Sequence, residues 1–147
     1  MGQKMGRKIW RVASTIIVVA VVAMLAFVFI QRITGREPEL FGYRMNYIRT
    51  PSMGEAIKAG DVILCKNAPA GEVEVGDIIT YESDGRIPGL PAGETVCHRV
   101  VEKRTEGGVL YLTTKGDANA DKDPEITGEQ VIGRFVRKLG LLTLFYK

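Results

Sequence analysis

The chain has little of several residue types that mark common kinds of site. Its 147 residues include one histidine and two cysteines, Cys65 and Cys97, and no two cysteines have Cys-x-x-Cys spacing. The missing spacing argues against a zinc site, and we expect neither a metal nor another cofactor. Both cysteines lie in apolar runs, so they are either small core residues or, in an oxidising space, a disulfide.

The chain has little net charge and one long run without charged residues. The formal net charge is only +3, and no basic stripe is interleaved with aromatic residues, which argues against a nucleic-acid partner. In addition, residues 12–30, with the sequence VASTIIVVAVVAMLAFVFI, contain no charged side chain. Because a helix needs about 20 apolar residues to cross the core of a bilayer, this run predicts a transmembrane helix.

Two other interpretations of this run are disfavoured. A buried core helix would be shorter and would have a repeating polar face. A cleaved signal peptide would have an apolar stretch of about 7–15 residues and a small-residue cleavage site, whereas this run continues into QRITGREPEL. We therefore expect an uncleaved anchor at residues 12–33, between a basic tail at 1–11 and a domain at 34–147.

Basic residues flank the anchor unevenly. Four precede it and two follow it closely, and glutamates soon offset the two that follow; the six are Lys4, Arg7, Lys8, Arg11, Arg32 and Arg36. Because Lys and Arg tend to remain in the cytoplasm, we expect the tail to be cytoplasmic. The domain would then lie outside the cell membrane, to which a single helix anchors it.

The domain after the anchor has the pattern of a compact all-β fold. Glycine and proline recur at short intervals, and no long segment repeats with the period of a helix. Between these turn signals lie short β-prone runs, at residues 61–66, 77–82, 95–103, 108–114 and 130–138. Together with the anchor, they predict a mostly β protein with one N-terminal transmembrane helix.

A Gly-Asp pair precedes an apolar strand at two places. The sequences are KAGDVI, which contains Asp61, and EVGDII, which contains Asp77. Since glycine permits unusual backbone angles and aspartate accepts hydrogen bonds from backbone N–H groups, we interpret both pairs as turn devices without a catalytic role.

Three separate features could supply the chemistry of a serine hydrolase. Ser52 lies between a predicted strand and a polar turn, and His98 is the only histidine of the chain. A serine that attacks an amide needs a base, and histidine titrates nearest to neutral pH. The loop TKGDANADKDP contains Asp117, Asp121 and Asp123, and a carboxylate bonded to the imidazole would fix its tautomer.

The acidic loop has two other interpretations. It could be a solvated turn, or it could bind calcium, since its acidic and amide side chains alternate as in the first part of an EF-hand loop. However, Lys122 stands where that motif needs glycine, and Gly128 stands where it needs glutamate. The calcium interpretation is therefore the weaker one.

Taken in order, SMGEAIKAGDVIL, HRVV, TKGDANADKDP and VIGRFV resemble the motif series of type I signal peptidases. The resemblance covers roughly residues 49–136 and is specifically to the branch of the endoplasmic reticulum, archaea and some Gram-positive bacteria. His98 stands where this branch has histidine and the bacterial Ser-Lys branch has lysine. The resemblance implies a membrane-bound serine endopeptidase that removes signal peptides from exported preproteins.

The resemblance also implies roles for individual residues. Ser52 falls on the nucleophile and His98 on the base, while the family's spacing points to Asp123 as the carboxylate that orients the histidine, with Asp121 as the alternative. Asp117 would support the loop or the site. Thr50, with the Ser52 N–H, would hold the oxyanion.

Around the nucleophile the chain departs from the family. It has Thr50-Pro51-Ser52-Met53-Gly54-Glu55, where the family commonly has Ser-Gly-Ser-Met-Glu-Pro. This departure supports a rival function, a non-catalytic, membrane-tethered β domain that binds an extracellular partner. A second rival, compatible with the small size of the domain, is a specialised peptidase with few substrates. In the favoured interpretation, the partners are preprotein signal peptides, the lipid bilayer and the secretion machinery.

Overall fold

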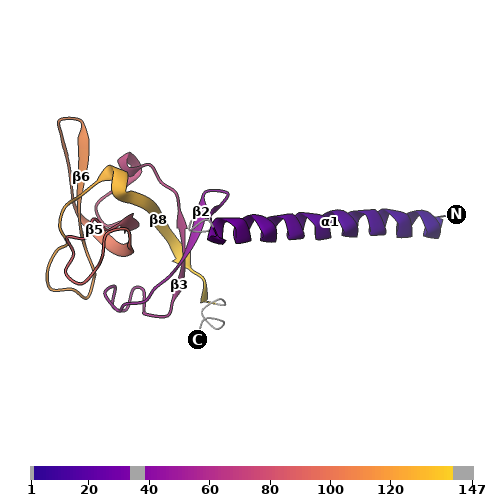
Figure 1. Ribbon diagram of the computed structural model, residues 1–147, viewed down its shortest axis with the longest axis horizontal. Coiled ribbons are helices and arrows are strands. Elements are labelled where there is room, and N and C mark those ends of the chain that lie inside the picture. Colours follow the sequence, from indigo (N-terminus) through magenta and orange to yellow (C-terminus); the bar gives the residue numbers. More distant parts are fainter. Residues whose placement is uncertain (1, 34–38, 141–147) are drawn as a thin grey trace. The chain divides into compact units, whose positions relative to one another are not determined.

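The computed structural model describes residues 2–33 and 39–140. It divides into two units, Met1–Leu40 and Phe41–Lys147. The first unit consists mainly of a long helix, and the second contains most of a β-sheet (Figure 1). Among the described residues, sheet and turns make up almost all of the chain after the helix, which confirms the prediction of a mostly β protein.

Helix α1 (Gly2–Ile33) begins well before the charge-free run. Its segment Lys8–Phe27, with a mean hydropathy of 2.2, is long and apolar enough to cross a membrane. Because an α-helix satisfies its own backbone groups, it is suited to a solvent that offers no hydrogen bonds. The polar side chains within the segment also bond locally, since Ser14 and Thr15 both donate to the carbonyl of Arg11 at 2.9 Å.

Eight strands form a single sheet in the described residues. They are β1 (Glu39–Leu40), β2 (Tyr43–Tyr47), β3 (Val62–Lys66), β4 (Ile78–Glu82), β5 (Thr95–Glu106), β6 (Val109–Lys115), β7 (Ile126–Thr127) and β8 (Val131–Lys138). Their order is β1-β2-β3-β8-β4-β5-β6-β7, and the neighbouring strands from β2 to β7 in this order pair antiparallel. β8 therefore lies between β3 and β4. The five predicted β-prone runs correspond to β3, β4, β5, β6 and β8.

Both faces of the sheet are covered by apolar side chains, as the alternation along β4 and β5 requires. One cluster contains Val73, Ile79, Tyr81, Val96, Val100, Leu112 and Ile126. The other contains Ile48, Met53, Ile57, Ile63 and Cys65, with Ile78, Cys97 and Phe135 packed against it. A second small core thus lies directly beneath the segment that follows β2 and contains Ser52.

The two Gly-Asp pairs are turn devices, as predicted. Asp61 Oδ2 accepts a hydrogen bond from the N–H of Lys58 at 2.9 Å, and Asp77 Oδ2 accepts one from the N–H of Glu74 at 3.0 Å. In both cases the carboxylate satisfies a donor three residues earlier, just before a strand begins.

The two cysteines are free thiols in the second cluster. Burial raises the pKa of Cys65 to about 11 and that of Cys97 to about 12. A thiol that stays protonated is a poor nucleophile, so both residues serve as small apolar core side chains in this structure.

Candidate active site

His98 and Asp123 form a buried pair. His98 lies on β5, which is paired with β4 and β6, and Asp123 lies in the segment between β6 and β7. The distance from His98 Nδ1 to Asp123 Oδ2 is 2.5 Å, and the two side chains are 8% and 7% exposed. A carboxylate at Nδ1 favours the tautomer with the proton on that nitrogen, which leaves Nε2 free to accept a proton.

The same oxygen of Asp123 has two further partners. Thr114 Oγ1 donates to Asp123 Oδ2 at 2.7 Å, and the hydroxyl of Tyr81 donates to it at 3.1 Å. Burial acts to raise the pKa of Asp123, but the hydrogen bonds from His98, Thr114 and Tyr81 outweigh it, and the pKa lies below its usual value. Asp123 is therefore ionised at neutral pH.

Ser52 lies in a tight turn after β2. The N–H of Gly54 donates to the carbonyl of Pro51 at 2.9 Å, and Met53 is buried in the second core with an exposed fraction of 1%. Gly54 has a φ of +55°, a conformation in which a side chain is strained. Glycine is therefore the residue that suits position 54 in this turn.

The segment after β6 brings Ser52 and His98 together. The N–H of Ala118 donates to the backbone oxygen of Ser52 at 2.9 Å. A Cβ placed on Gly116 would lie 2.6 Å from the backbone oxygen of Ser52 and 2.9 Å from His98 Nε2. Because both atoms lie so near one point, the backbone oxygen of Ser52 and His98 Nε2 are close to each other.

The hydroxyl of Ser52 bonds to Thr50. The distance from Ser52 Oγ to Thr50 Oγ1 is 3.2 Å, and in the described part of the chain no hydrogen bond joins Ser52 Oγ to His98. Catalytic hydrogen bonds are often long in the absence of substrate and tighten when it binds. The structure thus has the His98–Asp123 pair formed and Ser52 in the neighbouring turn.

We expect Gly116→Ala to reduce turnover by roughly 100-fold. The added methyl group would press on a backbone oxygen, that of Ser52, and on the ring of His98, which Asp123 holds in place. Neither atom is the end of a flexible side chain, so the serine and the imidazole must move apart. The experiment measures the initial rate of substrate cleavage by the full-chain variant, and its melting temperature shows whether it is folded.

Gly71→Ala is the matched control for this substitution. A Cβ at Gly71 would meet nothing within 4 Å, so this variant should cleave at the parent rate. If Gly116→Ala were as active as Gly71→Ala, the close approach of Ser52 and His98 at Gly116 would not matter for turnover.

Asp117 does not contact His98 directly. Its carboxylate accepts two hydrogen bonds from Arg99, from Nε at 2.9 Å and from Nη2 at 2.7 Å. Arg99 Nη1 also donates to the carbonyl of Gly76 at 2.9 Å. The hydrogen bond from Arg99 holds the pKa of Asp117 below its usual value. The pair fastens the start of the acidic loop to β5, next to His98.

Asp121 is exposed and lies apart from the pair. Of the two aspartates that the sequence left open as partners of the histidine, the structure brings Asp123, not Asp121, to His98. The roles of Ser52, His98, Asp123, Asp117 and Thr50 in a reaction remain predictions, which the geometry permits.

Sequence reasoning missed three residues of this site, Tyr81, Thr114 and Gly116. Two of them could have been found, because alternation along a strand places Tyr81 with Ile79, and Thr114 with Leu112, on an inward face. A polar side chain at an inward position needs a partner. The partner itself, Asp123, lies in an irregular segment whose course no periodic pattern predicts.

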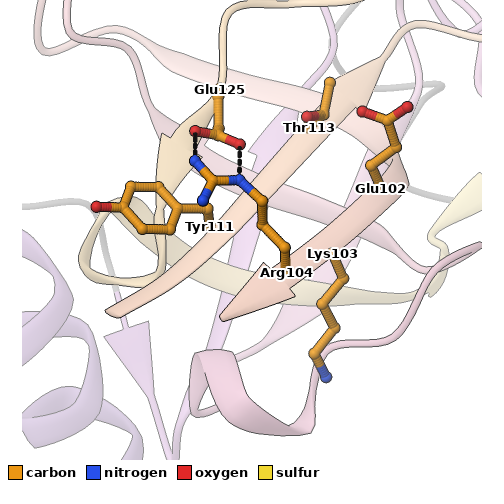
Figure 2. Close-up of a pocket in the computed structure, with 6 residues that line it drawn as sticks. All are labelled: Glu102, Lys103, Arg104, Tyr111, Thr113 and Glu125. Carbon is orange, nitrogen blue, oxygen red and sulfur yellow. Dashed lines mark hydrogen bonds and ion pairs between the residues drawn. The ribbon is translucent and has the colours of Figure 1, made fainter. Parts of the chain in front are cut away.

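A pocket lies elsewhere, on the outer face of the β5–β6 hairpin (Figure 2). Its residues are Glu102, Lys103, Arg104, Tyr111, Thr113 and Glu125. Arg104 donates to both oxygens of Glu125, at 2.8 and 2.6 Å, and its guanidinium lies 4.2 Å from the ring centre of Tyr111. Because these contacts already satisfy the charge of Arg104, the pocket does not resemble a site for an anion.

Comparison with known proteins identifies relatives of the chain. It is 34% identical to signal peptidase I W of Bacillus subtilis over 110 residues, which are 74% of this chain and 54% of the relative. It is 38% identical to the signal peptidase complex catalytic subunit SEC11 of Colletotrichum graminicola over 76 residues, 51% and 41% of the two chains. For SEC11 of Eremothecium gossypii the identity is 33% over 106 residues, 63% and 59%.

No protein-family model matches the chain, and the chain spans about half the length of the relatives that it matches. The relatives nevertheless have one name in common, and they include both a bacterial enzyme and subunits from fungi. The chain is a homologue of the proteins named signal peptidase I and signal peptidase complex catalytic subunit.

Proposed function

We propose that the chain is a membrane-bound serine endopeptidase that removes signal peptides from exported preproteins. One observation carries the proposal: a buried His98–Asp123 pair lies beside the turn of Ser52, with only Gly116 between the serine backbone and the imidazole. The names of its homologues supply the class of substrate.

In this proposal Ser52 Oγ attacks the carbonyl carbon of the scissile bond. The hydroxyl proton passes to His98 Nε2, and the charge of the imidazolium that forms is balanced by Asp123 at 2.5 Å from Nδ1. The developing oxyanion is held by the N–H of Ser52 and by the hydroxyl of Thr50, which lies within 3.2 Å of the nucleophile.

His98 then returns the proton to the leaving amine. The peptide bond breaks, and the signal peptide remains attached to Ser52 as an ester. Water, deprotonated by the same imidazole, hydrolyses this ester and restores the free serine. Arg99 and Asp117 hold the adjacent loop during these steps.

The location follows from the helix and its flanking charges. Helix α1 would anchor the chain in the cell membrane, with the basic N-terminus in the cytoplasm and the β domain outside. The name of the SEC11 relatives refers to a signal peptidase complex, so membrane partners connected with secretion are part of the proposal.

The test is cleavage of a preprotein by the full chain in liposomes. The substrate has an apolar signal segment with alanine at the first and third positions before the expected cut, because the family resemblance implies small residues there. We expect one cut, directly after the alanine at the first position before the expected site. N-terminal sequencing of the product identifies the cut. A matched preprotein with tryptophan at that position should stay intact.

A well-folded chain that cleaves neither substrate across several preproteins would contradict the proposal. The non-catalytic membrane-tethered domain would then be the better interpretation. Cleavage of only a narrow set of preproteins would instead support the specialised peptidase.

A further inference from the structure

We propose that Tyr81 and Thr114 are positioning residues, whose hydroxyl groups hold one oxygen of Asp123 against the imidazole of His98. Both side chains are fully buried, with exposed fractions of 0%. Their hydroxyls lie 3.1 and 2.7 Å from Asp123 Oδ2, the atom that also contacts His98 Nδ1. This inference rests on the proposed function, since it assigns the support of the same catalytic pair.

The register of three strands brings these side chains to one place. On β4, Ile79 lies opposite His98, so Tyr81 is a diagonal neighbour of the histidine. On β6, Thr114 lies opposite Val100, which makes it the other diagonal neighbour. Diagonal neighbours on one face of a sheet are about 7–8 Å apart, and the carboxylate of Asp123 fills the space between the three.

The count of protons explains why Asp123 is held as an anion. Each hydroxyl has one proton to donate, so Thr114 and Tyr81 together can donate two hydrogen bonds. Their hydroxyls make three short contacts: one from each to Asp123 Oδ2, and one with each other at 3.1 Å. Because a carboxylate is a stronger acceptor than a hydroxyl, both protons point to Asp123 Oδ2. That oxygen then accepts three hydrogen bonds, which are stronger to a carboxylate than to a neutral carboxyl and so favour the ionised form.

Thr114 holds Asp123 at a second point. The N–H of Asp123 donates to the carbonyl of Thr114 at 2.8 Å. The threonine thus fixes both the backbone and the carboxylate of the aspartate, and the intervening residues 115–122 form a loop closed at its base. Loss of the Thr114 hydroxyl would leave the backbone contact intact and would free only the carboxylate.

Two ionisable groups on the packed strands interact with Asp123 through charge and hydrogen bonds, namely His98 and Tyr81. In turn, Asp117 interacts electrostatically with His98, and Asp84 with Tyr81. Burial raises the pKa of Tyr81 above its usual value, so it stays a donor throughout the working range of pH. The hydroxyls of Thr114 and Tyr81 lower the pKa of Asp123. Removal of either hydroxyl should therefore raise the pH at which the His98–Asp123 pair takes up a proton.

The first part of the experiment measures cleavage of the alanine-containing preprotein by full-chain variants. We expect Thr114→Val to lower kcat roughly 10- to 100-fold and Tyr81→Phe, which loses a longer hydrogen bond, about 3- to 10-fold. KM should change less than about twofold, because neither residue contacts substrate. Thr114→Ser, which restores the hydroxyl, should recover most of the lost kcat.

The matched controls are Thr113→Val and Tyr111→Phe. Both residues lie on β6 but line the outer pocket of the hairpin, where Figure 2 shows Tyr111 beside Arg104 and Thr113 near Glu102. Each control removes a hydroxyl from the same type of residue as its test variant, and neither residue takes part in the hydrogen bonds to Asp123 described above. Both should retain the parent kcat.

The second part does not depend on activity. His98 is the only histidine of the chain, so its ring signals in a nuclear magnetic resonance titration report the His98–Asp123 pair without ambiguity. In Thr114→Val the midpoint of this titration should move upward by roughly 0.5 pH unit or more. The controls should leave the midpoint where it is in the parent.

An unchanged midpoint in both Thr114→Val and Tyr81→Phe overturns the inference, whether or not the chain cleaves preproteins. A loss of activity that only follows the loss of folded protein, with an unchanged midpoint, also overturns it, because the hydroxyls would then be merely structural. If the midpoint shifts but the parent cleaves nothing, the positioning role stands and the proposed function fails.

Discussion

Replacement of Ser52 by alanine will reduce kcat for preprotein cleavage by about a million-fold, to the background rate. Alanine has no Oγ, so neither the attack on the scissile carbonyl nor the ester intermediate can form. Among the described residues, the side chain makes one hydrogen bond, to Thr50 at 3.2 Å, and the melting temperature should therefore change by less than about 2 °C. The measurement combines single-turnover cleavage with thermal unfolding of the full chain.

Ser14→Ala is the matched control for Ser52→Ala. Ser14 lies in α1, where its hydroxyl bonds only to the carbonyl of Arg11 in the preceding turn, so its loss should leave cleavage unchanged. If Ser52→Ala cleaves preproteins as fast as the Ser14→Ala control does, Ser52 is not the nucleophile. The assignment of the whole site would then be wrong, since the histidine and the aspartate were identified by their relation to it.

Asp123→Asn should lower kcat by about 10,000-fold with little change in KM. The amide has almost the shape of the carboxylate but no charge to balance the imidazolium. If its NH₂ group turns toward His98, the ring must also hold its proton on Nε2, the wrong nitrogen for a base that faces Ser52. The same cleavage assay measures the loss, and the nuclear magnetic resonance signals of His98 report the tautomer.

Asp121→Asn provides the comparison within the same loop. Asp121 is exposed, and its neutralisation should change kcat by less than about twofold. The opposite result, with Asp121→Asn inactive and Asp123→Asn active, would mean that the loop rearranges when substrate binds. In a Ser52→Ala background, Asp123→Asn should cause no further loss, because the two residues act in one step.

Much of the fold could be predicted from hydrophobic patterns. The charge-free run predicted the helix, and short apolar runs between glycines predicted β3, β4, β5, β6 and β8. The helix begins earlier than the apolar run because basic residues also favour a helix, and nothing before residue 12 breaks it. The short strands β1 and β7 could not be foreseen, since two residues give no alternation to detect.

The site was only partly accessible from the sequence. The single histidine and the acidic loop were visible, but the choice between Asp121 and Asp123 depends on the path of the loop after β6. That path is set by the contact of Ala118 with the Ser52 backbone and by the attachment of Asp123 to Thr114. Both are long-range or irregular hydrogen bonds, which leave no periodic trace in the sequence.

Strand β8 has a consequence for the order of events during synthesis. In the sheet, β3 and β4 are not neighbours, because both pair with β8, which follows both of them in the chain. Strand β8 joins two parts of the sheet. One part is β1–β3, next to the segment with Ser52, and the other is β4–β7, which includes His98 on β5. Since pairing between distant segments is slow and must wait for the later strand, a growing chain holds Ser52 and His98 in halves of the sheet that are not yet joined. Under the proposed function, the site is assembled only once β8 has been made, so a partly synthesised chain would not yet be able to cleave a preprotein.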